Sequence, residues 1–247
     1  MSRAQIWRNC LLGSPYTIHF IREYTINIGK ISKHNDDILK DIKRTYPMNA
    51  FFNDHIEKLS NILNTYAYVN NGMGYAQGMA FLAFVLFKVY HEDDPLYAAE
   101  DTFYSLHNII QVIRPAYPLN DKDKSAVNFN DHMSSSVALL IGKKNKPLAL
   151  KLKEMDLIKI FIYQHIPCLF ANRYKVEDCC ILWDFIIRPE SKEMFHRILC
   201  IVAGMIMTVE PVVMNMSFDS ILGIMQHNST YNVRRVITKA SLLLNIN

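Results

Sequence analysis

The sequence predicts an all-α fold, and three observations support this prediction. Apolar residues recur at helical spacing through most of the chain, no strand-like alternation is sustained, and every residue from Met79 to Phe87 is apolar. A helix that is apolar on every side is buried on every side, so residues 79–90 are expected to form the central helix of a helical domain. Lys88 ends this run well short of the ~20 apolar residues that span a membrane.

Further helices are expected on both sides of the central helix. The first covers residues 3–12, with Gly13 placed as its C-terminal cap, and a weaker helical stretch follows Pro15. Residues 51–66 carry a clean helical stripe of apolar side chains. Later helical stretches are expected at 93–117, 148–158, 198–207, 218–225 and 233–240. The polar stretch 120–136 is instead expected to be a surface loop or a junction between lobes.

Residues 35–46 form the next expected helix. Asn35 is placed as its N-cap, and Pro47 should end it at Tyr46, because the residue before a proline is disfavoured in the α region. Arg44 then lies in the last turn, with Asp41 one turn earlier. The expected buried face consists of Ile38, Leu39 and Ile42.

A loop rich in asparagine and glycine, residues 70–78, leads into the central helix. Its GxGxxxG spacing follows a helix, which excludes both the dinucleotide fingerprint and the P-loop. Tyr75 and Gln77 lie where this loop meets the buried helix, a place where functional sites tend to be built. Taken alone, Gln77 near a helix start and the Asp41/Arg44 spacing are ordinary surface features.

The composition is that of a folded globular protein. Of the 247 residues, 50% are hydrophobic and 20% are charged, and the formal net charge is +4. The densest basic run, 143–146, indicates a solvated loop, so we expect no nucleic-acid partner.

The cysteines, histidines and chain ends suggest a cytoplasmic protein. Five scattered cysteines without a CxxC pair favour reduced, buried thiols, and the nine histidines show no HExxH spacing. We find no signal peptide, lipidation motif or integral membrane segment, so any contact with membranes is expected to come through a partner.

Read together, two stretches resemble the signature motifs of a known family. Residues 38–47 fit IxxDxxRTxP, and residues 74–79 fit GYxQGM. In this order they resemble the TBC domain, whose members are GTPase-activating proteins for Rab GTPases. The resemblance extends to Arg3, Trp7 and Leu11–Gly13 (RxxxWxxLLG), to 100–104 (EDxFxxL), and to 168–170 and 182–184 (WxxxLF and WD). His165 and Pro167 depart from the family pattern, which usually has a tryptophan at position 165.

The resemblance implies both a fold and a function. It implies a single TBC-type domain over 1–247, with two helical lobes that form a groove and a lobe junction near 118–150. Arg44 and Gln77 would be catalytic fingers supplied in trans to a GTP-bound Rab GTPase, with a role in vesicle trafficking on endomembranes. The supporting residues would be Ile38, Asp41, Tyr75 and Gly78.

This reading gives the chain no substrate and no cofactor of its own, since GTP and Mg²⁺ are carried by the partner GTPase. The alternative is that the same fold binds a Rab GTPase as a catalytically silent effector or scaffold. The presence of both Arg44 and Gln77 favours catalysis.

Overall fold

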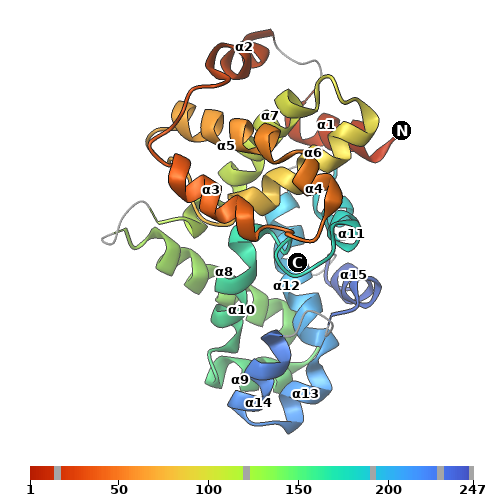
Figure 1. The fold of residues 1–247 in the computed structure, drawn as a ribbon. Helices are drawn as coiled ribbons and strands as arrows, with labels where there is room; N and C mark the ends of the chain where they lie inside the picture. The colour runs from red at the N-terminus through yellow and green to blue at the C-terminus, as the bar shows by residue number, and fades with distance from the viewer. Residues whose placement is uncertain (14–17, 119–122, 190–192, 227–230, 245–247) are drawn as a thin grey trace. The chain divides into compact units, whose positions relative to one another are not determined.

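The computed structural model describes residues 1–13, 18–118, 123–189, 193–226 and 231–244, and the regular structure in these ranges is entirely helical (Figure 1). The all-α prediction is therefore confirmed. Two compact units divide the chain, and each is described below by itself. The first consists of Met1–Arg114, Pro167–Asn172 and Ile187–Ser191, and the second of Pro115–Ile166, Arg173–Ile186 and Lys192–Asn247.

The main division, after Arg114, lies just before the range 118–150 in which a lobe junction was expected. That the units act as lobes forming a groove stays a prediction. Within the described ranges, no helix combines the length and the apolar character that a membrane crossing requires.

Helix α6 (Met79–Asp93) is the core of the first unit, as the sequence predicted. From Met79 to Tyr90 every residue is buried except the partly buried Phe81 and Lys88. It packs against α5 and α7 (Figure 1). The other helices of this unit are α1 (Arg3–Leu12), α2 (Ile18–Asn27), α3 (Asn35–Arg44), α4 (Ala50–Asp54), α5 (Ile56–Val69) and α7 (Ala98–Ile113), with the 3₁₀ turn η1 (Arg114–Ala116) at the boundary.

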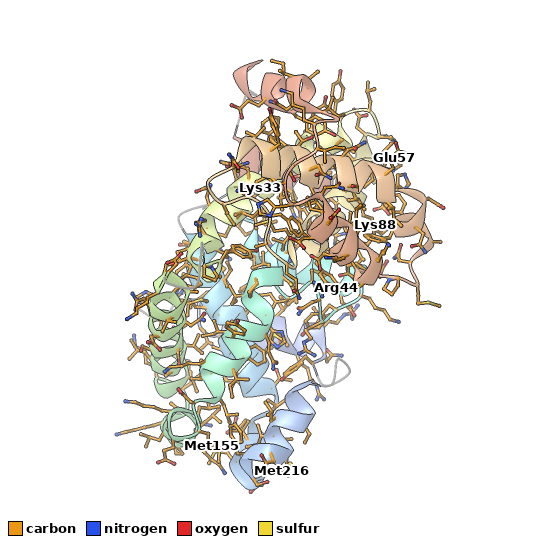
Figure 2. All side chains as sticks on the ribbon, turned by 60° about the vertical axis from the view of Figure 1, so that its left-hand side comes forward. Lys33, Arg44, Glu57, Lys88, Met155 and Met216 are labelled. Atoms are coloured by element: carbon orange, nitrogen blue, oxygen red, sulfur yellow. The ribbon has the colours of Figure 1, made fainter. Side chains whose placement is uncertain are left out.

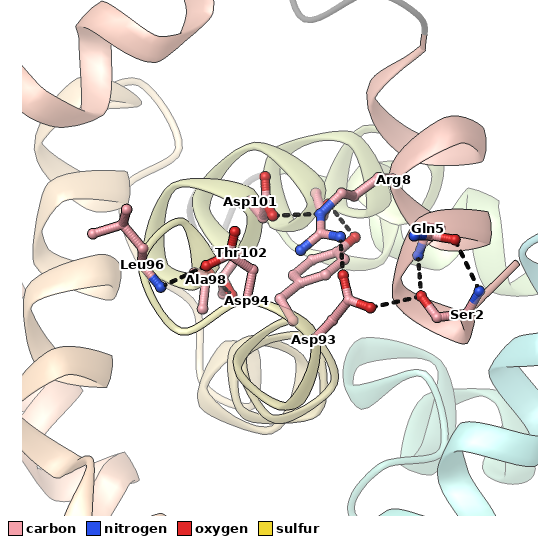
Figure 3. Close-up of polar contacts among 11 residues, drawn as sticks. Ser2, Gln5, Arg8, Asp93, Asp94, Leu96, Ala98, Asp101 and Thr102 are labelled. Atoms are coloured by element: carbon pink, nitrogen blue, oxygen red, sulfur yellow. Dashed lines mark hydrogen bonds and ion pairs between the residues drawn. The ribbon is translucent and has the colours of Figure 1, made fainter.

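A charged network attaches α1 to α6 and α7. Arg8 donates from Nε to Asp101 at 2.6 Å and from Nη1 to Asp93 at 2.5 Å, while Ser2 donates its hydroxyl to Asp93 at 2.7 Å (Figure 3). The guanidinium also lies 5.2 Å from the ring centre of Tyr90. These contacts connect the chain start to the central helix, and Gly13 ends α1 with a φ of 75°, as predicted for a cap.

Some local predictions in this unit were wrong. Asn35 does not cap α3 but is its first residue, and its side-chain oxygen accepts a hydrogen bond from Asn64 at 3.0 Å. Leu39 is 38% exposed, because it lies beside rather than on the buried stripe of α3. The stretch 51–66 forms two helices, since Asn49 caps the short α4 and the chain turns at His55. The residues directly after Pro15 lie outside the described ranges, and α2 begins at Ile18.

The second unit consists of α8 (Ser125–Gly142), α9 (Lys146–Glu154), α10 (Leu157–His165), α11 (Val176–Ile186), α12 (Met194–Thr208), α13 (Glu210–Asn215), α14 (Phe218–Gln226) and α15 (Val233–Ser241). The 3₁₀ turn η2 (Ile166–Cys168) begins in this unit and ends in the first. The predicted loop at 120–136 is wrong from Ser125 onward, because this stretch begins α8. Phe129, Met133 and Val137 recur every four residues and are buried. The polar residues that suggested a loop occupy the exposed face of an amphipathic helix; residues 119–122 lie outside the described ranges.

Helix α15 approaches α12 closely at Gly204. A Cβ atom at this position would lie 2.7 Å from the Val236 carbonyl oxygen and 3.0 Å from the Ala240 nitrogen, both backbone atoms of α15. Only a residue without a side chain allows the two helices to pack at this distance.

His165 occupies the position where the family pattern usually has a tryptophan, and it is fully buried in α10. Its ring packs edge-on against Phe161, with ring centres 4.2 Å apart. Burial, assisted by the positive charge of Arg173, lowers the pKa of His165 to about 3.

Replacing Gly204 by alanine should destabilise the protein by about 1–2 kcal/mol, because overpacking against rigid backbone outweighs the helix propensity gained. Gly223→Ala in α14 is the matched control, since its added Cβ would meet no atom within 4 Å from other parts of the described chain. That change should stabilise by roughly 0.5–1 kcal/mol. Urea unfolding of both variants measures the difference, and stabilisation by both would contradict the close approach.

Acid should destabilise the native protein partly through His165. The unfolded histidine has a pKa near ~6.5 and the folded one a lower pKa, so the unfolded state binds the extra proton. The contribution of His165 is complete above the unfolded pKa and is lost as the pH falls from there toward 3. The slope is at most about 1.4 kcal/mol per pH unit.

Unfolding free energies of wild type and His165→Phe across this pH range measure the effect. The variant should show the shallower slope, whatever its absolute stability. Burial also lowers the pKa of His107, but that contribution is common to both proteins and cancels in the comparison. Equal slopes would show that His165 is not the responsible group.

Candidate functional site

A buried carboxylate, that of Asp41, lies at the centre of the site in the first unit. Asp41 is 1% exposed and accepts three hydrogen bonds from two separate segments. Arg44 donates its Nε to Oδ1 at 2.7 Å, while the Tyr75 hydroxyl and the Gly78 amide, the latter at 2.7 Å, donate to Oδ2. One carboxylate thus connects the end of α3 to the loop before α6.

The sequence of α3 places Asp41 inward and Arg44 outward. Ile38 and Ile42 are fully buried and anchor the helix, and Asp41, which lies beside Ile38 on the helical wheel, also faces the interior. The Thr45 hydroxyl donates to the Asp41 carbonyl at 2.8 Å, and Thr45 leaves the helix with extended backbone. The predicted helix end before Pro47 is confirmed.

Glycine is required at position 78 for two reasons. Its φ of 100° lies in the left-handed region, and a Cβ there would lie 2.6 Å from the sulfur of Cys168. Gly78 is also the residue before the first turn of α6, so its amide is one of the donors that a helix start leaves without an intrahelical acceptor. The Asp41 carboxylate satisfies that donor.

Tyr75 acts as a fixed hydrogen-bond donor. It is 8% exposed, and burial together with the negative charge of Asp41 raises the pKa of its hydroxyl far above the usual range. The hydroxyl therefore keeps its proton at physiological pH and donates it to Asp41. This bond holds the backbone of the loop two residues before Gln77.

Arg44 and Gln77 extend to the surface around one hollow. The hollow has a volume of about 310 Å³ and is lined by Asp37, Lys40, Asp41, Arg44, Tyr75 and Gln77. Figure 2 labels Arg44 among the side chains of the first unit. The Arg44 side chain is 53% exposed, and Gln77 is exposed as well. With the described residues, the terminal guanidinium nitrogens of Arg44 and the amide of Gln77 form no hydrogen bond. The hollow thus presents a cation, Arg44, and a neutral amide, Gln77, to solvent side by side.

Four of the six predicted site residues, Asp41, Arg44, Tyr75 and Gln77, line this hollow. Gly78 is joined to them through its hydrogen bond to Asp41, and Ile38 is buried on α3 without lining the hollow. Among the described residues, no group of three or more histidine, cysteine or acidic side chains has an arrangement that could hold a metal ion.

Sequence reasoning missed a second support, the segment Pro167–Asn172 of the first unit. Tyr46 donates its hydroxyl to the Ala171 carbonyl, and its ring contacts Phe81 and Phe84 with centres 5.3 and 5.0 Å apart. The same segment brings Cys168 against Gly78.

The backbone of this support adopts an uncommon conformation. Tyr46, Leu169 and Phe170 have φ values of 43°, 43° and 69°, and the last two are fully buried. Left-handed backbone in bulky residues persists only where surrounding packing imposes it. No local sequence pattern connects positions 46 and 171, which explains why the sequence did not reveal this contact.

Comparison with known proteins places the chain in a family. A model of the Rab-GTPase-TBC domain family matches residues 1–211. The chain is 24% identical over 194 residues to human TBC1 domain family member 13, covering 76% of this chain and 48% of that protein. It is 28% identical over 193 residues to growth hormone-regulated TBC protein 1 of Xenopus tropicalis, covering 75% and 53%. The chain thus spans about half the length of the curated relatives it matches.

A solved structure shares the fold. The crystal structure of the Ypt/Rab-GAP domain of Gyp1p superposes with a TM-score of 0.75 at 15% sequence identity, covering 99% of this chain and 88% of that one. At this identity the likeness concerns the fold alone. Because the family model matches most of its residues, the chain belongs to the Rab-GTPase-TBC domain family.

Proposed function

We propose that this chain accelerates GTP hydrolysis by a Rab-type small GTPase, to which it supplies Arg44 and Gln77 in trans. One observation carries the proposal: the buried Asp41 carboxylate binds both the Arg44 guanidinium and the loop that bears Gln77. Two surface residues that are far apart in the sequence are thereby held around one hollow. A module that only binds a GTPase would not require both Arg44 and the loop that bears Gln77 to be held in fixed positions.

Arg44 has the chemistry of an arginine finger. Hydrolysis builds charge on the phosphate oxygens, and a planar, permanently charged guanidinium binds them through several donors at once. Asp41 engages only Nε, so the two terminal nitrogens remain for a phosphate. Such a finger contributes roughly 10³–10⁵ in rate, or about 4–7 kcal/mol of barrier.

Gln77 has the chemistry of a residue that orients water. Its amide can accept a hydrogen bond from the attacking water and donate to backbone without adding charge. In this proposal it takes the place of the GTPase's own switch glutamine. The fixed position of Tyr75 and Gly78 limits the movement of the loop and so reduces the entropy lost when the transition state forms.

The proposed partner is the GTP-bound form of a Rab GTPase, which brings GTP and Mg²⁺ with it. The chain would then need no cofactor of its own, and it would meet endomembranes through the partner during vesicle trafficking. The proposed unit of function is the TBC domain over 1–247.

Single-turnover GTP hydrolysis with a panel of Rab GTPases tests the two fingers. Wild type should accelerate at least one Rab. Arg44→Ala should reduce that acceleration by roughly 10³ or more, because transition-state charge loses its partner. Gln77→Ala should reduce it strongly, and Arg44→Lys should not restore it, because an ammonium lacks the planar fork.

Lys58→Ala is a charge-matched control on the exposed face of α5, away from the hollow, and should keep full acceleration. If Rab proteins bind without any acceleration, the effector or scaffold alternative replaces the proposal. Full acceleration by Arg44→Ala would remove the finger assignment while leaving the family membership intact.

Asp41→Asn tests the common support. The amide carries no charge to balance Arg44 and brings its own donors toward Tyr75 and Gly78, so the unfolding free energy should fall by about 2–3 kcal/mol. Tyr75→Phe removes a single donor and should cost less stability, about 1 kcal/mol, while still slowing hydrolysis. Denaturant unfolding measures the loss of stability, and single-turnover rates at a temperature where each variant is folded measure the loss of activity caused by misplacement of Arg44 and Gln77. Wild-type stability of Asp41→Asn would contradict the geometry.

A further inference from the structure

The second unit contains a basic hollow, and none of the residues that line it has a role in the proposed activity. It has a volume of about 420 Å³ and lies where the end of α12 and the start of α13 meet α15. Three cations of α15 line it: Arg234, Arg235 and Lys239. We call this site the α15 basic hollow.

The sequence of α15 explains why its cations gather on one side. Val233, Val236 and Ala240 are buried against α12, which leaves positions 234, 235, 238 and 239 on the opposite edge. The close approach at Gly204 brings this edge beside the last turn of α12. The hollow thus lies beside the close contact between α12 and α15.

The charge in the hollow is not balanced by neighbours. Helix α15 contains no acidic residue, and within the described part of the chain none of the three cations forms an ion pair. The lining also contains the carboxylate of Glu210, the first residue of α13. It accepts a hydrogen bond from the side chain of Asn145, which caps α9. Three cations thus face one carboxylate that already has a partner.

We propose that the α15 basic hollow binds a phosphate monoester carried on a small organic body, such as an inositol phosphate headgroup. Two adjacent arginines can bind phosphate oxygens through paired donors, and Lys239 adds a point charge. The hydroxyls of Thr208 and Thr238 already donate to the carbonyls of Gly204 and Arg234, so recognition falls to the cations.

The rest of the lining fits the organic part of such a ligand. Met207 and Pro211 give the hollow an apolar wall, which inorganic phosphate would not use. The volume lies within the roughly 300–1,000 Å³ of small-molecule sites. This site is separate from the proposed GTPase activation, and either can fail without the other.

Vesicle co-sedimentation of the full chain tests the site. Phosphatidylcholine vesicles containing phosphatidylinositol 4-phosphate should bind the protein more tightly than vesicles given the same total charge with phosphatidylserine. Arg234→Ala/Arg235→Ala should weaken binding by roughly 30-fold, which corresponds to about 1 kcal/mol for each basic residue lost near an anionic surface. The two arginines are exposed and form no ion pair with the residues that the structure describes, so the variant should melt like wild type.

Lys144→Ala/Lys153→Ala is the matched control, because it removes the same charge from exposed positions of the second unit outside the hollow. It should keep nearly full binding. Soluble inositol hexakisphosphate distinguishes the sources of the ligand: binding in solution without vesicle binding assigns a free phosphate ester, and vesicle binding that it cannot displace assigns a lipid. No binding, equal binding to phosphatidylserine vesicles, or equal losses in the two double variants would overturn the proposal.

Discussion

The first unit depends on how a buried negative charge is compensated. An unpaired carboxyl group inside a protein is costly, so the burial of Asp41 requires hydrogen-bond donors around it. The structure supplies a guanidinium, a phenol and a backbone amide, and these come from two segments, the end of α3 and the loop before α6. The electrostatic requirement of one side chain therefore determines how a helix end and a glycine loop meet.

In this site the residues that hold the loop and the helix end are buried, and the residues that could contact a ligand are exposed. Tyr75 and Gly78 are buried and use their donors within the protein, whereas the ends of Arg44 and Gln77 face solvent. The ion pair between half-exposed Arg44 and Asp41 contributes little stability, because solvent screens it. Its effect is to restrict the rotamers of Arg44 while leaving the terminal nitrogens for a ligand, and restricted side chains lose less entropy on binding.

The two hollows show two ways in which a helical fold presents positive charge. In the first unit, Arg44 is held by a buried carboxylate and a loop, so its position depends on long-range contacts. In the second unit, the cations of α15 follow from the amphipathic pattern of one helix, which packs closely against α12 at Gly204. The first arrangement suits a single directed contact, and the second suits a ligand with several negative charges.

The sequence by itself determined what local patterns control: the all-α class, the buried central helix α6, the end of α3 before Pro47 and the pair of motifs that identify the family. Tertiary structure decided what depends on distant partners, namely the hydrogen bond from Tyr46 to Ala171 and the helical state of Ser125–Gly142. The physical reason is the distance along the sequence over which each interaction acts. Helical periodicity and caps act within a few residues, whereas the surface that buries the few apolar residues of a polar stretch, or the partner of a hydroxyl, depends on which surfaces the folded chain brings together.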